Sequence, residues 1–265
     1  DLKNILQWQK IEGQIIDPKV KNIDMLSHPH LFPFGTGGEN DARPDPFYHK
    51  NQFYQSLMAK TNPRFRRDCD WLCDCAMRQD QRQLEQGMFN MRKQPNLAKT
   101  AGEFRSLIQN NPAEVKKNLR RVLSKLRGSA PWWCDRGREL KAMDEQWGPA
   151  TFFLTLSVAE YKWPDLGDYL RFKNADLPDH IKNDQNALIK ADPASVMDFF
   201  KMRLENFLKN VLKVDTGEPG VLGIVDHHWG RIEFQARGTP HFHMKLWMRD
   251  APIHGVNTNK EISEY

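Results

Sequence analysis

The sequence Arg231-Ile-Glu-Phe-Gln-Ala-Arg-Gly-Thr-Pro-His-Phe-His-Met-Lys-Leu-Trp247 has the pattern of a two-stranded β-hairpin. Apolar and polar residues alternate on both sides of Gly238, which can supply a tight turn. The apolar positions are Ile232, Phe234, Ala236, Phe242, Met244 and Leu246. The polar positions are Glu233, Gln235, Arg237, His241, His243 and Lys245. We therefore expect two antiparallel strands with one apolar face and one polar face.

The polar face of this hairpin carries the side chains of a metal site. With the connection running over residues 236–240, Gln235 lies opposite His241 and Glu233 lies opposite His243. Opposed residues of an antiparallel pair have Cβ atoms about 4.5–5.5 Å apart, so two imidazoles and one side-chain oxygen can converge on a divalent ion. Glu233 is the better charged donor and Gln235 is nearer the turn. We prefer Gln235 as the third ligand, and both residues stay open.

The composition allows a soluble globular chain. Its 265 residues are enough for one large domain or two modest ones. No run of about 18 apolar residues is present, so no membrane role is expected. The N-terminus, Asp1-Leu-Lys-Asn4, resembles no targeting signal, and we expect a fragment of a longer protein. The net charge of +5 and the pI near 9.0 are compatible with a polyanionic partner but do not require one.

The four cysteines argue against a secreted disulfide framework because they are few and clustered. A reducing, intracellular compartment is expected instead. Cys69, Cys73 and Cys75 could belong to a zinc knuckle, but no C-x2-C pair and no pair of histidines follows at the spacing of a zinc finger. We interpret these three as buried thiols.

Residues 1–130 are expected to form a mainly helical region. Residues 31–46 are rich in Gly, Pro, Asn and Asp and predict a loop that lacks the Lys-Ser/Thr of a phosphate-binding loop. His28-Pro-His30 precedes this loop, and we interpret it as structural. Residues 48–91 favour helix, with an interruption at Pro63. A basic cluster there predicts a solvated face, with a phosphate contact as the alternative: Arg64, Arg66 and Arg67.

A further helix is marked at both ends. Asn111 is a suitable N-cap, Pro112 suits the first turn, and Gly128 can end the helix. Its outer face is basic and can meet either solvent or a nucleic-acid backbone, and both interpretations stay open. The basic residues are Lys116, Lys117, Arg120, Arg121, Lys125 and Arg127.

The C-terminal half predicts a mixture of strands and helices. Residues 151–158 are rich in aromatic and β-branched residues and predict a buried strand. Residues 163–167 predict a turn. Residues 193–213 place apolar side chains at helical spacing, and residues 221–225 begin another strand.

The motif Glu233-Phe-Gln-x-Arg-Gly-x-Pro-His-x-His-x3-Trp247 resembles the metal motif of the replication-initiator-like, or HUH, endonuclease domain of Helitron transposases. Further stretches agree with that family, and the similarity runs from about residue 28 to the end. They are Leu31-Phe-Pro-x-Gly-x-Gly-Gly38 with Asn40-Asp-x-Arg-Pro44, Thr151-Phe-Phe-Leu-Thr-Leu-Ser157 with Glu160-Tyr-x-Trp-Pro-Asp-Leu166, and Asp192-Pro193 with Phe199-Phe-x2-Arg203.

The resemblance implies a single-stranded DNA endonuclease and strand transferase acting on transposon ends. In that family Mg²⁺ or Mn²⁺ polarises the scissile phosphate while a tyrosine attacks it, which leaves a 5′-phosphotyrosine link and a free 3′-OH. It also implies a helicase domain in the same full-length chain and a nuclear location. A degenerate domain that binds single-stranded DNA without cutting it is the alternative.

The resemblance also implies an α+β fold of the HUH type. We expect a central antiparallel sheet with strands at 151–158, 221–225, 230–236 and 241–248. The 193–213 helix is expected to back this sheet, with helices on one face. The domain division is expected at residue 130, with a helical region over 1–130 and the endonuclease domain over 131–265.

The family's nucleophile is one of two tyrosines spaced Tyr-x3-Tyr, and this sequence has no such pair. Its tyrosines are at 48, 54, 161, 169 and 265, and none is followed by another four residues later. We expect the chain to be truncated before the tyrosine helix, so that it binds metal and DNA but does not nick.

Other residues are expected to contact DNA or are set aside. Arg231, Arg237 and Lys245 fall on or beside the metal face and are expected to contact phosphate, and Trp163 is expected to stack on a base, with burial as its alternative.

His227-His228 lie too far along the strand to join the site, because eight residues span roughly 26 Å. A zinc hydrolase of the His-x-His-x-Asp-His type is disfavoured, because residues 244–246 are Met, Lys and Leu.

Overall fold

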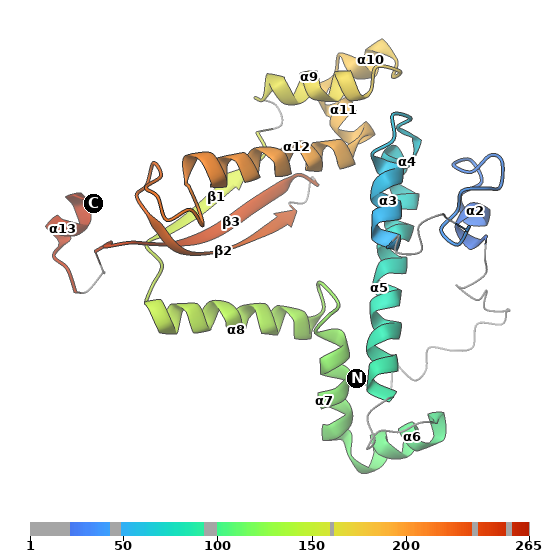
Figure 1. The fold of residues 1–265 in the computed structure, drawn as a ribbon, viewed down its shortest axis with the longest axis horizontal. Coiled ribbons are helices and arrows are strands. Elements are labelled where there is room, and N and C mark those ends of the chain that lie inside the picture. Colours follow the sequence, from blue (N-terminus) through green and yellow to red (C-terminus); the bar gives the residue numbers. More distant parts are fainter. Residues whose placement is uncertain are drawn as a thin grey trace. The chain divides into compact units, whose positions relative to one another are not determined.

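The computed structural model describes residues 22–42, 49–92, 100–159, 162–234, 238–252 and 256–264. The chain is a mixed α+β protein, mostly helical, with a small antiparallel sheet (Figure 1). It divides into two compact units, Asp1–Trp71 and Leu72–Tyr265, called here the N-terminal and C-terminal units. The division at residue 130 expected from the sequence stays a prediction.

The N-terminal unit is built around an aromatic core. Phe65 lies between Phe32 and Trp71, with ring centroids 5.3 and 4.9 Å away. Pro63 separates two helices, as predicted. Arg66 is buried and donates to the carbonyl oxygen of Lys60 at 3.1 Å, so the prediction of a solvated face is wrong for this residue. The helices are α2 (Ile23–Ser27), α3 (Lys50–Met58), α4 (Arg64–Arg67) and the start of α5 (Cys69–Arg92).

The helices that precede the sheet have clear N-caps. The side chain of Asn111 accepts from the Glu114 amide at 3.2 Å, which confirms the predicted cap. Gly128 has a positive φ of 87° but lies in the connection after the helix. The interpretation of the clustered cysteines as buried is right for Cys75 and wrong for Cys69 and Cys73, and none of the four cysteines forms a disulfide. The helices are α6 (Ala101–Asn110), α7 (Pro112–Leu123) and α8 (Ala130–Trp147).

In the described part of the C-terminal unit, a three-stranded antiparallel sheet has the order β1-β3-β2. Its strands are β1 (Phe152–Ser157), β2 (Val225–Phe234) and β3 (Pro240–Met248). The two strands predicted at 221–225 and 230–236 are therefore wrong as separate elements, because β2 is one continuous strand. Residues 220–223 form a turn closed by an isolated bridge between Gly220 and Gly223. β1 is an edge strand with alternating exposure, not the buried strand expected.

One face of the sheet packs against helices and forms the main core. Leu166, Leu170 and Leu188 from the helices and Met244 and Leu246 from β3 all have 0% exposure. The predicted turn at 163–167 is wrong: a helix begins at Pro164 because Leu166 and Leu170 lie four residues apart on one buried face. The helices are α9 (Pro164–Lys173), α10 (Asp179–Lys182), α11 (Gln185–Ala191), α12 (Pro193–Asn206), its continuation as the π-helix η1 (Phe207–Val211), and near the end of the chain α13 (Asn259–Glu264).

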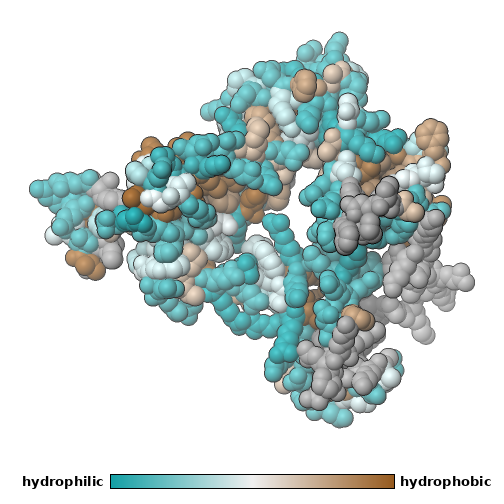
Figure 2. All heavy atoms as spheres, in the orientation of Figure 1, coloured by the Kyte–Doolittle hydropathy of each residue, from teal (hydrophilic) through white to brown (hydrophobic). Residues whose placement is uncertain are grey.

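The other face of the sheet is partly covered by α8, so the expectation of helices on one face is incomplete. The Nζ atom of Lys245 lies 3.0 Å from the Asp144 carboxylate of α8. The indole Nε1 of Trp247 donates to the carbonyl oxygen of Gly148 at 2.9 Å. In Figure 2, apolar residues gather where α12 meets the sheet, whereas hydrophilic residues make up most of the rest of this view. The alternation of apolar and polar residues along the strands identifies the two faces of the sheet. It does not identify α8 as the helix that covers the more polar face.

The packing of Gly230 against Phe242 provides a test of this sheet. A Cβ atom at Gly230 would lie 2.4 Å from Cζ of Phe242, a ring that is buried in the core. We expect Gly230→Ala to destabilise the C-terminal unit by about 1–3 kcal/mol in urea unfolding. The control is Gly137→Ala in α8, where nothing lies within 4 Å of the added methyl and the helix gains up to about 1 kcal/mol. Equal stability of the Gly230→Ala and wild-type proteins would contradict the packing.

Candidate metal centre

The two histidines of β3 lie between the other two strands of the sheet. On β2, Glu233 is opposite His241 and Arg231 is opposite His243. The predicted register, with Gln235 opposite His241, is therefore wrong by two positions: Phe234 pairs with Pro240, so the connection runs over residues 235–239 and not 236–240, and moving it by one residue moves the register by two. A shift by two preserves the face, so Glu233 and both histidines still share it.

The edge strand β1 supplies two hydroxyl groups to this face. Ser157 is opposite His241 and Thr155 is opposite His243. The Ser157 hydroxyl lies 2.9 Å from Nδ1 of His241, and the Thr155 hydroxyl lies 3.0 Å from Nδ1 of His243. Each hydroxyl thereby fixes one ring and leaves its Nε2 atom for another partner. The sequence interpretation missed both residues, although they alternate with the apolar residues of β1.

The Nε2 atoms of the two histidines lie on the face that carries Glu233. The two imidazole rings stack at 25° with centroids 6.3 Å apart. Nε2 of His243 lies 3.4 Å from a carboxylate oxygen of Glu233, which also pairs with Arg231. Nε2 of His241 is buried and has no hydrogen-bond partner in the described structure. A buried polar atom without a hydrogen-bond partner costs free energy. A divalent ion bound to Nε2 of His241 would remove this cost.

The predicted DNA-contacting residues have different surroundings. Lys245 is paired with Asp144, and the Arg231 guanidinium lies 5.0 Å above the centre of the Trp133 ring. Trp163 lies at the start of α9, with the Arg203 guanidinium 4.5 Å above its ring, and packs against the core on the α12 side. Trp163 is therefore on the sheet face opposite the histidine pair. The DNA roles of these residues stay predictions, and Gln235 and Arg237 lie outside the described residues.

A hollow bordered by tryptophan and arginine side chains adjoins the histidine face. Its volume is about 340 Å³. Arg136 and Arg231 lie over the rings of Trp132 and Trp133, at 5.8 and 5.0 Å from the ring centres. We call it the Trp/Arg groove and define it by Arg127, Trp132, Trp133, Arg136, Trp229 and Arg231.

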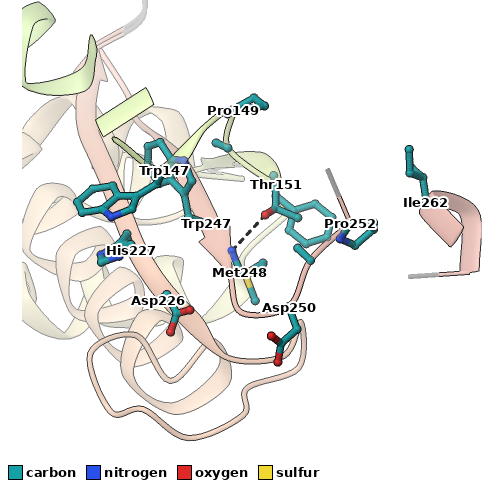
Figure 3. A pocket seen from close by; sticks show the side chains of 13 residues that line it. Trp147, Pro149, Thr151, Asp226, His227, Trp247, Met248, Asp250, Pro252 and Ile262 are labelled. Atoms are coloured by element: carbon teal, nitrogen blue, oxygen red, sulfur yellow. Dashed lines mark hydrogen bonds between the residues drawn. The ribbon is translucent and has the colours of Figure 1, made fainter. Parts of the chain in front are cut away.

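A second hollow, of about 410 Å³, lies at the other end of the hairpin (Figure 3). His227 stacks on Trp147 there, with centroids 3.6 Å apart, and is opposite Trp247 in the sheet. In Figure 3 these three side chains gather on one side of the hollow, and Ile262 lies on the other. His227 is therefore separate from the histidine pair, as its spacing predicts.

A second His/His/carboxylate group is found in the N-terminal unit. The ligand atoms of His28, His30 and Asp68 all lie within 4.8 Å of one another and could hold a metal ion. The prediction of a merely structural His28-Pro-His30 did not anticipate this group. Partial burial raises the pKa of the Asp68 carboxyl, but hydrogen bonds from His30 and the Trp71 amide, with the nearby imidazoles, lower it below its ordinary value overall. Asp68 is thus held in its ionised form.

A family model identifies the family of this chain. A family model described as the Helitron helicase-like domain at the N-terminus matches residues 53–246. The match covers most of the chain, so the chain belongs to this family, a domain found in Helitron transposon proteins. Searches of curated proteins and of solved structures found no match. Among the described helices, none is long and apolar enough to cross a membrane.

The Lys245–Asp144 pair predicts a measurable link between α8 and the sheet. Both side chains are partly exposed, so we expect a coupling free energy of up to about 1 kcal/mol. Lys245→Met, Asp144→Asn and the double variant form the double-mutant cycle, measured by urea unfolding. Strictly additive effects of the two changes would show that the pair does not hold α8 on the sheet.

Proposed function

We propose that this domain is the HUH-type endonuclease and strand-transferase domain of a rolling-circle Helitron transposase, acting on single-stranded DNA in a metal-dependent reaction. The observation that carries the proposal is the pair of β3 histidines, each with Nδ1 held by a hydroxyl of β1. A carboxylate on β2 shares their face. The family match and the motif resemblance point in the same direction.

His241 and His243 would hold Mg²⁺ or Mn²⁺ through their Nε2 atoms. Glu233 would supply the third ligand, and Gln235 is the alternative. The bound ion would supply Lewis-acid polarisation of the scissile phosphate. Ser157 and Thr155 hold the imidazoles in one orientation, which reduces the reorganisation needed on binding.

The nucleophile would be a tyrosine outside this sequence. Tyr54 lies in the N-terminal unit and donates to Glu39 at 2.5 Å. Tyr169 packs on Phe199 on the core side of the sheet. Tyr54 is buried within its own unit, Tyr169 does not lie on the histidine face, and the other three tyrosines are outside the described residues. In the proposed reaction the tyrosine oxygen forms a bond to the 5′ phosphate, and the 3′ oxygen leaves as a hydroxyl.

The Trp/Arg groove supports single-stranded DNA as the substrate. Unpaired bases can stack on exposed aromatic rings, and guanidinium groups attract the phosphate backbone. Trp133 is 42% exposed and contacts Arg231, which is opposite His243 on the sheet. A strand bound in the groove would therefore pass beside the histidine pair. A helicase domain in the full-length protein and a nuclear location belong to the same proposal.

Metal binding tests the proposed centre directly. We expect His241→Ala and His243→Ala to abolish Mn²⁺ binding at this site in calorimetric titration. Thr155→Val keeps the shape of the side chain but removes the hydroxyl, so we expect roughly 10–100-fold weaker binding. The matched control is His180→Ala, since His180 is an exposed histidine on α10. Wild-type Mn²⁺ affinity in the His241→Ala/His243→Ala protein would overturn the assignment.

Binding of single-stranded DNA tests the Trp/Arg groove. Loss of one stacked base costs about 1–3 kcal/mol, so we expect Trp133→Ala to weaken the binding of an oligonucleotide by about 5–100-fold. The control is Phe172→Ala, which removes a ring that is 82% exposed on α9. The groove is not the DNA site if both variants bind with wild-type affinity in fluorescence anisotropy.

Cutting is tested in a Helitron protein that contains this domain together with a Tyr-x3-Tyr pair. With labelled single-stranded DNA and Mn²⁺, we expect a covalent protein–DNA adduct that is lost in His241→Ala and in His243→Ala. An adduct that persists in both variants contradicts the metal-site assignment. DNA binding without any adduct in the unaltered protein would favour the non-cleaving alternative.

A further inference from the structure

We propose that His28, His30 and Asp68 form a second metal site, which binds Zn²⁺ or a chemically similar transition-metal ion and stabilises the N-terminal unit. The site is independent of the proposed nuclease function, because its three ligands all lie in the N-terminal unit. It is also separate from the pair on β3, which lies in the C-terminal unit.

The geometry brings together ligands that are far apart in the sequence. Nε2 of His30 lies 2.5 Å from Oδ2 of Asp68, across 38 positions of the chain. The His28 and His30 rings meet edge to face with centroids 6.1 Å apart. A hydrogen bond between His30 and Asp68 needs only those two residues. The placement of His28 beside the same carboxylate adds the third ligand of a metal site.

The carboxylate is oriented by the start of a helix. Oδ1 of Asp68 accepts from the Trp71 amide at 2.8 Å, in the manner of a helix N-cap. The other oxygen, Oδ2, faces His30. Carboxylate ligands of metal ions typically use one oxygen to bind the ion, while the surrounding protein holds the other oxygen.

The turn that carries the histidines is fixed in the same way. The His28 amide donates to the carbonyl oxygen of Asp24 at 3.0 Å, and the His28 carbonyl oxygen accepts from the Leu31 amide at 3.0 Å. Phe32 then packs on Phe65. Because Phe65 also contacts Trp71, one aromatic core holds both the histidine turn and the Asp68 end of α5. The three ligands are therefore positioned before an ion binds.

The donor set suits a transition-metal ion. Two imidazole nitrogens and one carboxylate oxygen fit Zn²⁺. The β3 histidines with Glu233 offer the same kinds of donor, so variants of each site, and not the choice of ion, distinguish the two sites. His28 is buried, but the His30 side chain is 60% exposed, so water can complete a four-coordinate site from this side. A unit of this size rarely obtains enough stability from its apolar core alone, and small domains often add a structural metal.

The test separates metal binding from helix capping. Asp68→Asn keeps an oxygen that can cap α5 but removes the charge, and His30→Ala changes an exposed ring. Each variant of the whole chain is stripped with a chelator, checked for folding by circular dichroism and titrated with Zn²⁺ against a chromophoric chelator. His180→Ala is the matched control, and the His241→Ala/His243→Ala protein reports on the other site.

We expect Asp68→Asn and His30→Ala to lose one Zn²⁺ equivalent. The loss of affinity should exceed the roughly 10–100-fold effect of removing an outer-shell partner. We expect His180→Ala and the His241→Ala/His243→Ala protein to retain that equivalent. Zn²⁺ should also raise the melting temperature of the His241→Ala/His243→Ala protein but not that of the same protein carrying Asp68→Asn in addition. Zn²⁺ binding by Asp68→Asn and His30→Ala with wild-type stoichiometry and affinity would overturn the proposal.

Discussion

Two hydrogen bonds from the edge strand β1 to the central strand β3 determine what the histidine face can do. Through them, Ser157 and Thr155 fix the Nδ1 atoms of His241 and His243. These bonds exist only in the observed register of β1 on β3, because a shift by one residue would turn every hydroxyl to the core side. The buried apolar residues of the other face hold that register, so the core and the histidine centre depend on each other.

The sheet has two differently covered faces. On one side, α12 and its neighbouring helices bury Met244 and Leu246 of β3 completely. On the other side, α8 pairs Asp144 with Lys245 and places its tryptophans beside β2. The histidine pair and the Trp/Arg groove are therefore on the same face, which gives the proposed DNA strand a path beside the proposed ion.

The sequence was sufficient for local features and insufficient for those that depend on partners distant in the chain. Alternation predicted the hairpin, Gly238 has the positive φ of 83° expected of a turn glycine, and the cap at Asn111 is confirmed. The register was wrong because periodicity does not determine the residue at which a connection begins. Thr155 and Ser157 were missed because their role depends on the pairing of β1 with β3. Asp68 was missed beside His28-Pro-His30 because 38 positions separate it from His30.

Pulsed electron paramagnetic resonance of bound Mn²⁺ tests the central claim most directly, because it detects the nitrogen nuclei of coordinating imidazoles. The account predicts nitrogen couplings in the wild-type chain that disappear in the His241→Ala/His243→Ala protein and persist in Asp68→Asn. Nitrogen couplings that persist unchanged in the His241→Ala/His243→Ala protein would contradict the claim that these two residues hold the ion.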